Sequence, residues 1–199
     1  GWSAFFYEKG GGSLPDLGVY NIATITGLLG PAKSLIAMTN IITPERRVDN
    51  KGLIKVEAED NAMIIMEHAG GTLSHIHCGF NYFDPFGHGG KGQEKPSISI
   101  WGTKGNISLV GYDWAPAGVD MATHDEPATK RYLPDPGNYK WQEGATVVAD
   151  ALLNNTEPLI NPEHALHVLD IMEAARASST TGQKISLNST FNWPIVGSQ

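Results

Sequence analysis

The sequence predicts an α+β protein with an open, predominantly antiparallel β-sheet and helices packed on one of its faces. A helix-like segment comes first, a run of strand-like segments follows, and two further helix-like segments close the chain. Strands do not alternate with helices in the βαβ rhythm that a parallel sheet requires. Glycine pairs between neighbouring strand-like segments are typical of tight hairpins, which join antiparallel strands.

The first predicted helix covers residues 14–29. The preceding run, Ser13-Leu14-Pro15-Asp16, fits a capping box with proline in the first turn, where its missing N–H costs nothing. Apolar residues then recur at roughly helical spacing, and Gly30-Pro31 ends the helix.

Strand-like segments follow, β-branched or alternating in polarity and bounded by turn residues. They cover residues 33–42, 62–67, 73–82, 97–101 and 106–110. Gly70-Gly71 and Gly102–Gly105 are the predicted hairpin turns. Residues 112–138 are rich in Pro, Asp and Gly and show no period, which predicts an irregular excursion.

Two helices and a short strand are predicted near the end of the chain. The first helix lies around residues 140–153, and the second runs from Pro162 to about Ser178 with Asn161 as its N-cap. Residues 184–187 are a candidate closing strand.

One predicted strand is apolar on both of its faces, at Met63-Ile64-Ile65-Met66. An interior position in the fold explains this pattern, and so does a second protein surface that covers an otherwise open sheet face. The sequence favours neither explanation over the other.

Composition excludes several classes of protein. The chain has 199 residues, of which 41% are hydrophobic and 18% charged, enough for a folded domain with its own core. A net charge of −7 without any basic run argues against nucleic acid or an anionic membrane as a partner. The single cysteine, Cys78, excludes an internal disulfide and a cysteine-rich zinc site. No apolar run approaches the roughly 20 residues that span a bilayer.

The most informative segment begins at Gly10-Gly11-Gly12 and leads into a helix that carries Asp16 and Tyr20. Residues four apart share a helix face, so a carboxylate and a phenol are presented together near the positive end of the helix dipole. This pair suits binding a hydroxylated substrate and moving its proton. In the alternative interpretation, which the pattern alone favours, Asp16 completes the cap and Tyr20 borders the core.

This segment resembles the C-terminal domain of the Gfo/Idh/MocA oxidoreductases, whose Gly-Gly-Gly-x-Leu-x-Asp-x-Gly-x-His/Tyr pattern it matches from Gly10 to Tyr20. The resemblance continues, in the family's order, through Leu28–Pro31, Trp101–Gly105, Glu163–Leu169 and Thr181-Gly182. It implies that residues 1–199 are a single substrate-binding and oligomerisation domain, without the nucleotide-binding domain that precedes it in the family.

The resemblance also implies an activity. The intact protein is expected to be an NAD(P)-dependent oxidoreductase acting on a sugar or polyol-like alcohol, with Asp16 as an orienting substrate ligand and Tyr20 as the acid/base. A phenol has a reference pKa near 10, so this role calls for a nearby cation, which the family takes from a lysine of its other domain. Many members carry histidine where Tyr20 stands and a second aspartate where Ala23 stands, so the substrate class stays open.

The expected partners follow from the same resemblance. NAD or NADP is expected in the intact protein, whereas this chain alone is expected to bind neither and to be inactive. We expect a homodimer or higher oligomer formed through the sheet face, a cytoplasmic location (the periplasm being the alternative), and no nucleic acid or membrane partner.

Two motif matches do not carry function. Glu94-Lys95-Pro96 spells the family's lysine motif, but it follows the glycine-rich helix instead of preceding it, so we interpret Lys95 as a loop lysine before a strand. The glycine-rich start fails G-x-G-x-x-G at its last glycine, and residues 87–92 contain no Gly-Lys-Ser/Thr.

Histidines provide the remaining candidates. His75 and His77 alternate with Ile76 and therefore share one strand face, on the substrate-facing or partner-facing side, so they join Asp16 and Tyr20 as candidate substrate ligands. A metal site that adds His88 is the weaker hypothesis because no carboxylate has an evident place as third ligand, and no metal is predicted. His164 and His167 are expected to be solvated or to cap a helix.

The main alternative in function is a non-catalytic binding or dimerisation module that uses its open sheet face. An aromatic group at Trp2, Phe5, Phe6 and Tyr7 is expected in the core or in the wall of a substrate site.

Overall fold

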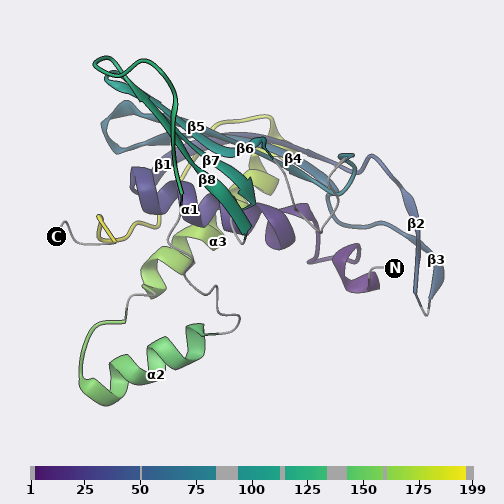
Figure 1. Ribbon diagram of the computed structural model, residues 1–199. Helices are drawn as coiled ribbons and strands as arrows, with labels where there is room; N and C mark the ends of the chain where they lie inside the picture. The colour runs from purple at the N-terminus through teal and green to yellow at the C-terminus, as the bar shows by residue number, and fades with distance from the viewer. Residues whose placement is uncertain are drawn as a thin grey trace. The chain divides into compact units, whose positions relative to one another are not determined.

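The computed structural model describes residues 3–49, 51–83, 94–112, 115–133, 143–158 and 161–195 (Figure 1). The chain divides into two compact units, one formed by Gly1–Tyr82 with Gly144–Gln199 and the other by Phe83–Glu143. Every strand pair within the described ranges is antiparallel, and helices accompany the sheets, which confirms the predicted α+β class. The strands are divided among three sheets.

The main sheet of the first unit has the order β10-β1-β4-β5. Its strands are β1 (Ala32–Asn40), β4 (Asn61–His68), β5 (Leu73–Gly79) and β10 (Ile185–Ser186). All four were predicted, with differences only at their ends. A short turn, η3 (Ala69–Gly71), joins β4 to β5, and positive φ angles of 86° and 85° explain glycine at positions 70 and 71.

Helices cover one face of this sheet, as predicted (Figure 1). The first predicted helix consists of a π-helical turn, η2 (Leu14–Gly18), followed by α1 (Val19–Leu29). The last helix, α3 (Pro162–Thr181), begins where Asn161 Oδ1 accepts the His164 N–H at 3.1 Å, so the predicted N-cap is confirmed. Gly182 ends it in the left-handed region. No helix in the described part of the chain is both long and apolar enough to cross a membrane.

The core of this unit lies between the sheet and its helices. Alternate residues of each strand point into it, which is the period-two pattern of a half-buried sheet. The buried side chains include Ile22 and Ile25 of α1, Leu35 and Ala37 of β1, Ala62, Ile64 and Met66 of β4, Ile76 and Cys78 of β5, and Val168, Ile171 and Ala175 of α3.

A separate hairpin, β2 (Glu45–Val48) and β3 (Gly52–Lys55), was not predicted, because its strands are short and charged. It packs on η1 (Ala4–Phe6) through a small apolar cluster built around Tyr7, Val48 and Val56. Tyr7 and Phe6 therefore belong to a core, as one interpretation of the aromatic group held, whereas Phe5 is exposed and Trp2 lies outside the described residues.

The second unit is a sheet of order β6-β7-β8-β9. β6 (Pro96–Gly102) and β7 (Gly105–Tyr112) form the predicted hairpin, and Lys95 directly precedes β6. The predicted irregular excursion is wrong where β8 (Ala115–Thr123) and β9 (Lys130–Tyr132) extend the sheet. β8 was missed because it contains Gly118, a residue that is unfavourable in strands. The φ of Gly118 is 151°, and a Cβ there would lie 2.8 Å from the Arg131 side chain, so the position requires glycine.

The helix predicted around residues 140–153 is α2 (Gly144–Asn154). The start of the predicted range, residues 140–142, lies outside the described residues, as do His88 and residues 87–92.

Candidate active site

The glycine-rich turn before the first helix is shaped by atoms of the chain itself. The Gly12 N–H donates to the Phe6 carbonyl at 2.9 Å, and the Ser13 N–H donates to the Glu59 carbonyl at 2.8 Å. A Cβ on Gly11 would lie 2.3 Å from the Phe5 carbonyl oxygen, and one on Gly12 would lie 2.5 Å from Glu59 Oε1. Glycine is required here because the backbone turns tightly against its own neighbours.

Asp16 and Tyr20 follow this turn on successive helical turns. Asp16 lies half-buried in the π-helical turn η2, and Tyr20 lies in the first turn of α1 with 54% of its surface exposed. Single π-helical turns are rare and occur frequently at functional sites. Ser13, the residue before this turn, makes no side-chain cap hydrogen bond within the described chain.

The helix start is seated against β5. A Cβ on Gly18 would lie 3.2 Å from Cys78 Sγ, and the thiol of Cys78 lies 4.0 Å from Ser13 Oγ. Burial raises the pKa of the Cys78 thiol to about 11, so the thiol stays protonated and unreactive at neutral pH. Cys78 is therefore a packing residue that seats the helix start on the sheet.

His75 and His77 lie on the other face of the same strand. Ile76 and Cys78 of β5 point into the helix-covered core, whereas the two histidines are exposed on the opposite side. The structure therefore brings Asp16 and Tyr20 onto one helix but separates both from His75 and His77. Both histidines lie on the sheet face that the helices leave uncovered.

The sheet face that carries these histidines has a regular cross-strand pattern, and we name it the open face. Ile36, Ile65 and His75 are paired across β1, β4 and β5, and Met38, Met63 and His77 form the next row. All six side chains are exposed. The hydroxyl of Tyr82 contacts both His77 Nε2 and Asn61 Oδ1 at the end of this face.

His167 corrects the expectation of a solvated or capping histidine. Its side chain is fully buried: Nε2 accepts the Ala32 N–H at 3.0 Å, and Nδ1 lies 2.8 Å from Ser189 Oγ. Ser189 donates in turn to Asp170 Oδ2 at 2.6 Å. Burial lowers the pKa of His167, and accepting a backbone N–H requires the neutral ring. His167 thus fastens α3 to the start of β1.

His164 also has a structural position. Its Nε2 lies 2.8 Å from Thr26 Oγ1 of α1, which joins the two helices that cover the sheet. Burial lowers the pKa of His164 as well.

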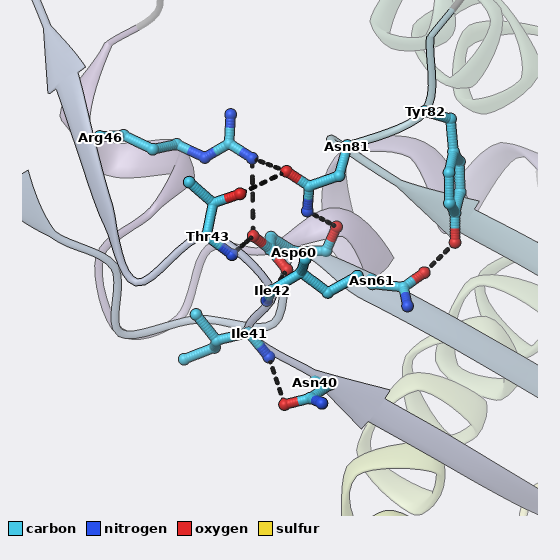
Figure 2. Close-up of polar contacts among 9 residues, drawn as sticks. All are labelled: Asn40, Ile41, Ile42, Thr43, Arg46, Asp60, Asn61, Asn81 and Tyr82. Carbon is cyan, nitrogen blue, oxygen red and sulfur yellow. Dashed lines mark hydrogen bonds and ion pairs between the residues drawn. The ribbon is translucent and has the colours of Figure 1, made fainter.

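Asp60 is a buried carboxylate that organises the chain between the sheet and the β2–β3 hairpin (Figure 2). Oδ1 accepts the Ile42 N–H at 2.7 Å, Oδ2 accepts the Thr43 N–H at 2.9 Å, and Arg46 Nη2 lies 3.5 Å from Oδ2. Burial opposes ionisation, but these hydrogen bonds, the side chain of Asn81 and the charge of Arg46 hold the pKa of Asp60 below its usual value. We assign Asp60 a structural role.

A dinucleotide does not fit the described residues of this chain. Their strand pairs are all antiparallel, so they contain no βαβ unit. The space beside Gly11 is filled by the carbonyl groups of Phe5 and Phe6, and the space beside Gly12 by the Glu59 carboxylate, which would repel a phosphate. Within the described ranges, no group of three His, Cys, Asp or Glu side chains is arranged to hold a metal ion.

Glu59 and Arg176 are residues of the site that sequence reasoning missed. Each contacts the glycine-rich turn, although they stand 117 residues apart in the chain. No local pattern marks either residue, because their pairing depends on how α3 crosses the sheet.

Comparison with known proteins agrees with this fold. The sequence model described as the GFO/IDH/MocA C-terminal domain matches residues 1–108, more than half of the chain. The chain therefore belongs to the GFO/IDH/MocA C-terminal domain family, and the predicted resemblance is confirmed. No curated protein matches the sequence.

Solved structures share the architecture at low sequence identity. A levoglucosan dehydrogenase in complex with NADH superposes with a TM-score of 0.75 at 16% identity, covering 94% of this chain and 54% of that one. An NAD-binding oxidoreductase from Klebsiella pneumoniae gives 0.72 at 15% identity, with coverages of 94% and 54%. An oxidoreductase from Agrobacterium radiobacter in complex with NAD+, L-tartaric acid and magnesium gives 0.64 at 18%, with coverages of 87% and 48%. The chain thus spans about half the length of these structures.

Proposed function

We propose that this chain is the substrate-binding and oligomerisation domain of an NAD(P)-dependent oxidoreductase that acts on a sugar or polyol-like alcohol. Tyr20 is the acid/base and Asp16 the substrate ligand in this proposal. A levoglucosan dehydrogenase complexed with NADH and L-sorbose is among the proteins of similar fold, which supports a carbohydrate-like substrate. The nucleotide would be held by a separate domain of the intact protein, because the residues described here do not fit it.

The observation that carries the proposal is the presentation of Tyr20. Tyr20 is 54% exposed at the start of α1, so more than half of its surface is open to a substrate. Asp16 stands one turn before it, at the helix end where backbone N–H groups point outward. A substrate that lies over this helix start meets both groups at once.

The chemistry assigned to this chain is proton transfer and orientation. Oxidation of an alcohol by a nicotinamide removes a hydride from carbon, and the adjacent hydroxyl must lose its proton. In our proposal the hydroxyl group of Tyr20 relays that proton away when the alcohol is oxidised and returns a proton when the carbonyl is reduced. Asp16 accepts hydrogen bonds from neighbouring hydroxyls and so fixes which carbon faces the cofactor.

The test is Tyr20→Phe in the intact protein, with turnover measured on a panel of sugars and polyols. Loss of a general acid/base lowers kcat by about 10²–10⁴-fold. Tyr132→Phe, which removes a hydroxyl from the second unit, is the matched control and leaves kcat unchanged. Near-normal turnover of Tyr20→Phe would show that Tyr20 has only a structural role.

Assembly through the open face is the second part of the proposal. Ile36, Ile65, Met38 and Met63 are exposed apolar side chains in two adjacent cross-strand rows, a pattern that supports a protein–protein contact on this face. A second copy of the chain packed on this face would cover them. The same observation favours the alternative, a non-catalytic dimerisation module. Sedimentation of the chain at high concentration tests both, and a monomer there would remove the assembly role.

A further inference from the structure

The glycine-rich turn is held from outside by one acid–base pair. Arg176 of α3 reaches Glu59 with two nitrogens, Nη2 to Oε1 at 3.0 Å and Nε to Oε2 at 3.3 Å. The same Nη2 also donates to the carbonyl of Gly11 at 3.1 Å. One guanidinium therefore joins the last helix, the carboxylate and the turn in a single fixed geometry.

Glu59 holds the turn at a second point. Its carbonyl accepts the Ser13 N–H at 2.8 Å, and its Oε1 occupies the space that a side chain at Gly12 would take. Gly11 and Ser13 are thus fixed on either side of Gly12, whose φ of 109° suits only glycine. The π-helical turn that carries Asp16 begins at the next residue, Leu14.

The pair is sheltered, unlike an ordinary surface salt bridge. The side chain of Glu59 is 9% exposed and that of Arg176 is 30% exposed. Arg176 has a further partner, Glu173, at 2.6 Å, but that carboxylate is 61% exposed and touches no part of the turn. Substitutions of Glu59 and of Glu173 can therefore distinguish two interactions of Arg176. The first is its contact with the turn, and the second is simple charge pairing along the helix.

We infer that Glu59 and Arg176 are positioning residues, which set the place of Asp16 and Tyr20 by fixing the turn at Gly11–Ser13. The inference rests on the proposed function of those two side chains. Neither member of the pair needs to touch substrate. A displacement of about 1 Å at the helix start moves both functional groups relative to the reacting carbon, and an error of this size costs about 10²-fold in rate.

The first measurement does not depend on activity. Amide hydrogen exchange in the intact protein reports protection at Gly11, Gly12 and Ser13, whose N–H groups donate to the carbonyls of Glu8, Phe6 and Glu59. Glu59→Gln keeps the shape of the side chain but loses the charge that holds Arg176, so protection at these amides falls. Glu173→Gln, the matched control, leaves protection unchanged. Equal exchange in both variants overturns the positioning role.

The second measurement is kinetic. Glu59→Gln raises KM for the sugar and lowers kcat, for a loss of about 10- to 100-fold in kcat/KM, while KM for the dinucleotide is unchanged. A merely structural role would reduce the amount of folded enzyme and leave KM for the sugar as it was, and this result overturns the inference. If Glu59→Gln does not fold, Arg176→Lys serves instead, because lysine keeps the charge but cannot span Glu59 and Gly11 together.

The two proposals fail in different ways. Normal turnover in Tyr20→Phe overturns the proposed function of the helix start, whatever the turn does. Loss of turnover in Tyr20→Phe together with wild-type kinetics and exchange in Glu59→Gln overturns only the positioning role of the pair.

Discussion

The two faces of the main sheet are built from the same strands but differ in their exposure to solvent. On one face, Ile64 of β4 is 1% exposed and packs beneath the helices. On the other face its neighbour Ile65 is 52% exposed in a row with Ile36 and His75. Two isoleucines adjacent in sequence thus lie in a closed core and on an open surface. Side-chain chemistry does not distinguish them, so their difference comes from what lies above each face.

The two faces are therefore expected to serve different purposes, one for the stability of the domain and the other for recognition of a partner. The covered face holds the domain together and seats the helix start that carries Asp16 and Tyr20. The open face contributes little to the fold of one chain, yet it retains isoleucine and methionine where water would favour polar residues. We therefore expect substitutions on the two faces to act on different measurable quantities.

The largest expected effect separates the two isoleucines. Ile64→Ala leaves a cavity in the core and lowers the free energy of unfolding by about 2–5 kcal/mol. Ile65→Ala lowers it by less than about 1 kcal/mol, since its side chain is half exposed in the single chain. Urea unfolding followed by circular dichroism, at concentrations where the chain is monomeric, measures both. Similar losses for the two variants would contradict the assignment of the faces.

A smaller effect is expected on association. Ile65→Lys places an unpaired ammonium group where the proposed second copy packs, so self-association weakens at least about tenfold, equivalent to about 1.4 kcal/mol. Leu153→Lys, a change of the same type at an exposed position of α2, is the control and leaves association as it was. Analytical ultracentrifugation across a concentration series measures the dissociation constant. An unchanged constant in Ile65→Lys would mean that the open face does not carry the contact.

The smallest effect is a pH dependence confined to the covered face. Burial lowers the pKa of His164 and of His167 in the folded chain, so below about pH 6.5 the unfolded chain binds more protons than the folded one. The contribution of the two neutral histidine rings to the free energy of unfolding is therefore complete above that pH and is lost as the pH falls. The free energy of unfolding should therefore decrease between pH 7 and pH 5.

Removing one of these rings tests the assignment. His167→Gln flattens the fall in stability between pH 7 and pH 5, because glutamine retains an acceptor for the Ala32 N–H but does not titrate. Leu169→Gln, an exposed position on the same helix, retains the wild-type slope. If His167→Gln keeps that slope as well, His167 is not a source of the acid sensitivity.

Sequence reasoning succeeded where the signal is local. Proline and glycine bounded the helix at 14–29, Asn161 capped the last helix, and glycine pairs marked the hairpins. It failed where hydrogen bonding between neighbouring strands outweighs the low strand propensity of the residues. β8 contains Pro116, Gly118 and Asp120, all unfavourable in strands, yet it lies between β7 and β9. The ambiguous strand at residues 63–66 is interior to its sheet, but the described residues of its own unit cover only one of its faces.

The candidate site divides in the same way. Asp16 and Tyr20 were proposed from the sequence because helical spacing and a family pattern are both local properties. The sequence did not predict that His75 and His77 are separated from Asp16 and Tyr20. Alternation along a strand shows that two residues share a sheet face, but it does not show which face that is.

By itself, the sequence determined the class of fold, the helix that carries Asp16 and Tyr20, and the family to which the chain belongs. All three depend on residues close together in the chain, where propensity, capping and spacing act directly. Tertiary structure alone decided which sheet face is open, why His167 is buried, and how Arg176 reaches Gly11 across 165 residues of sequence. These features depend on the packing of α3 against β1, and contacts between distant segments leave no periodic trace in the sequence.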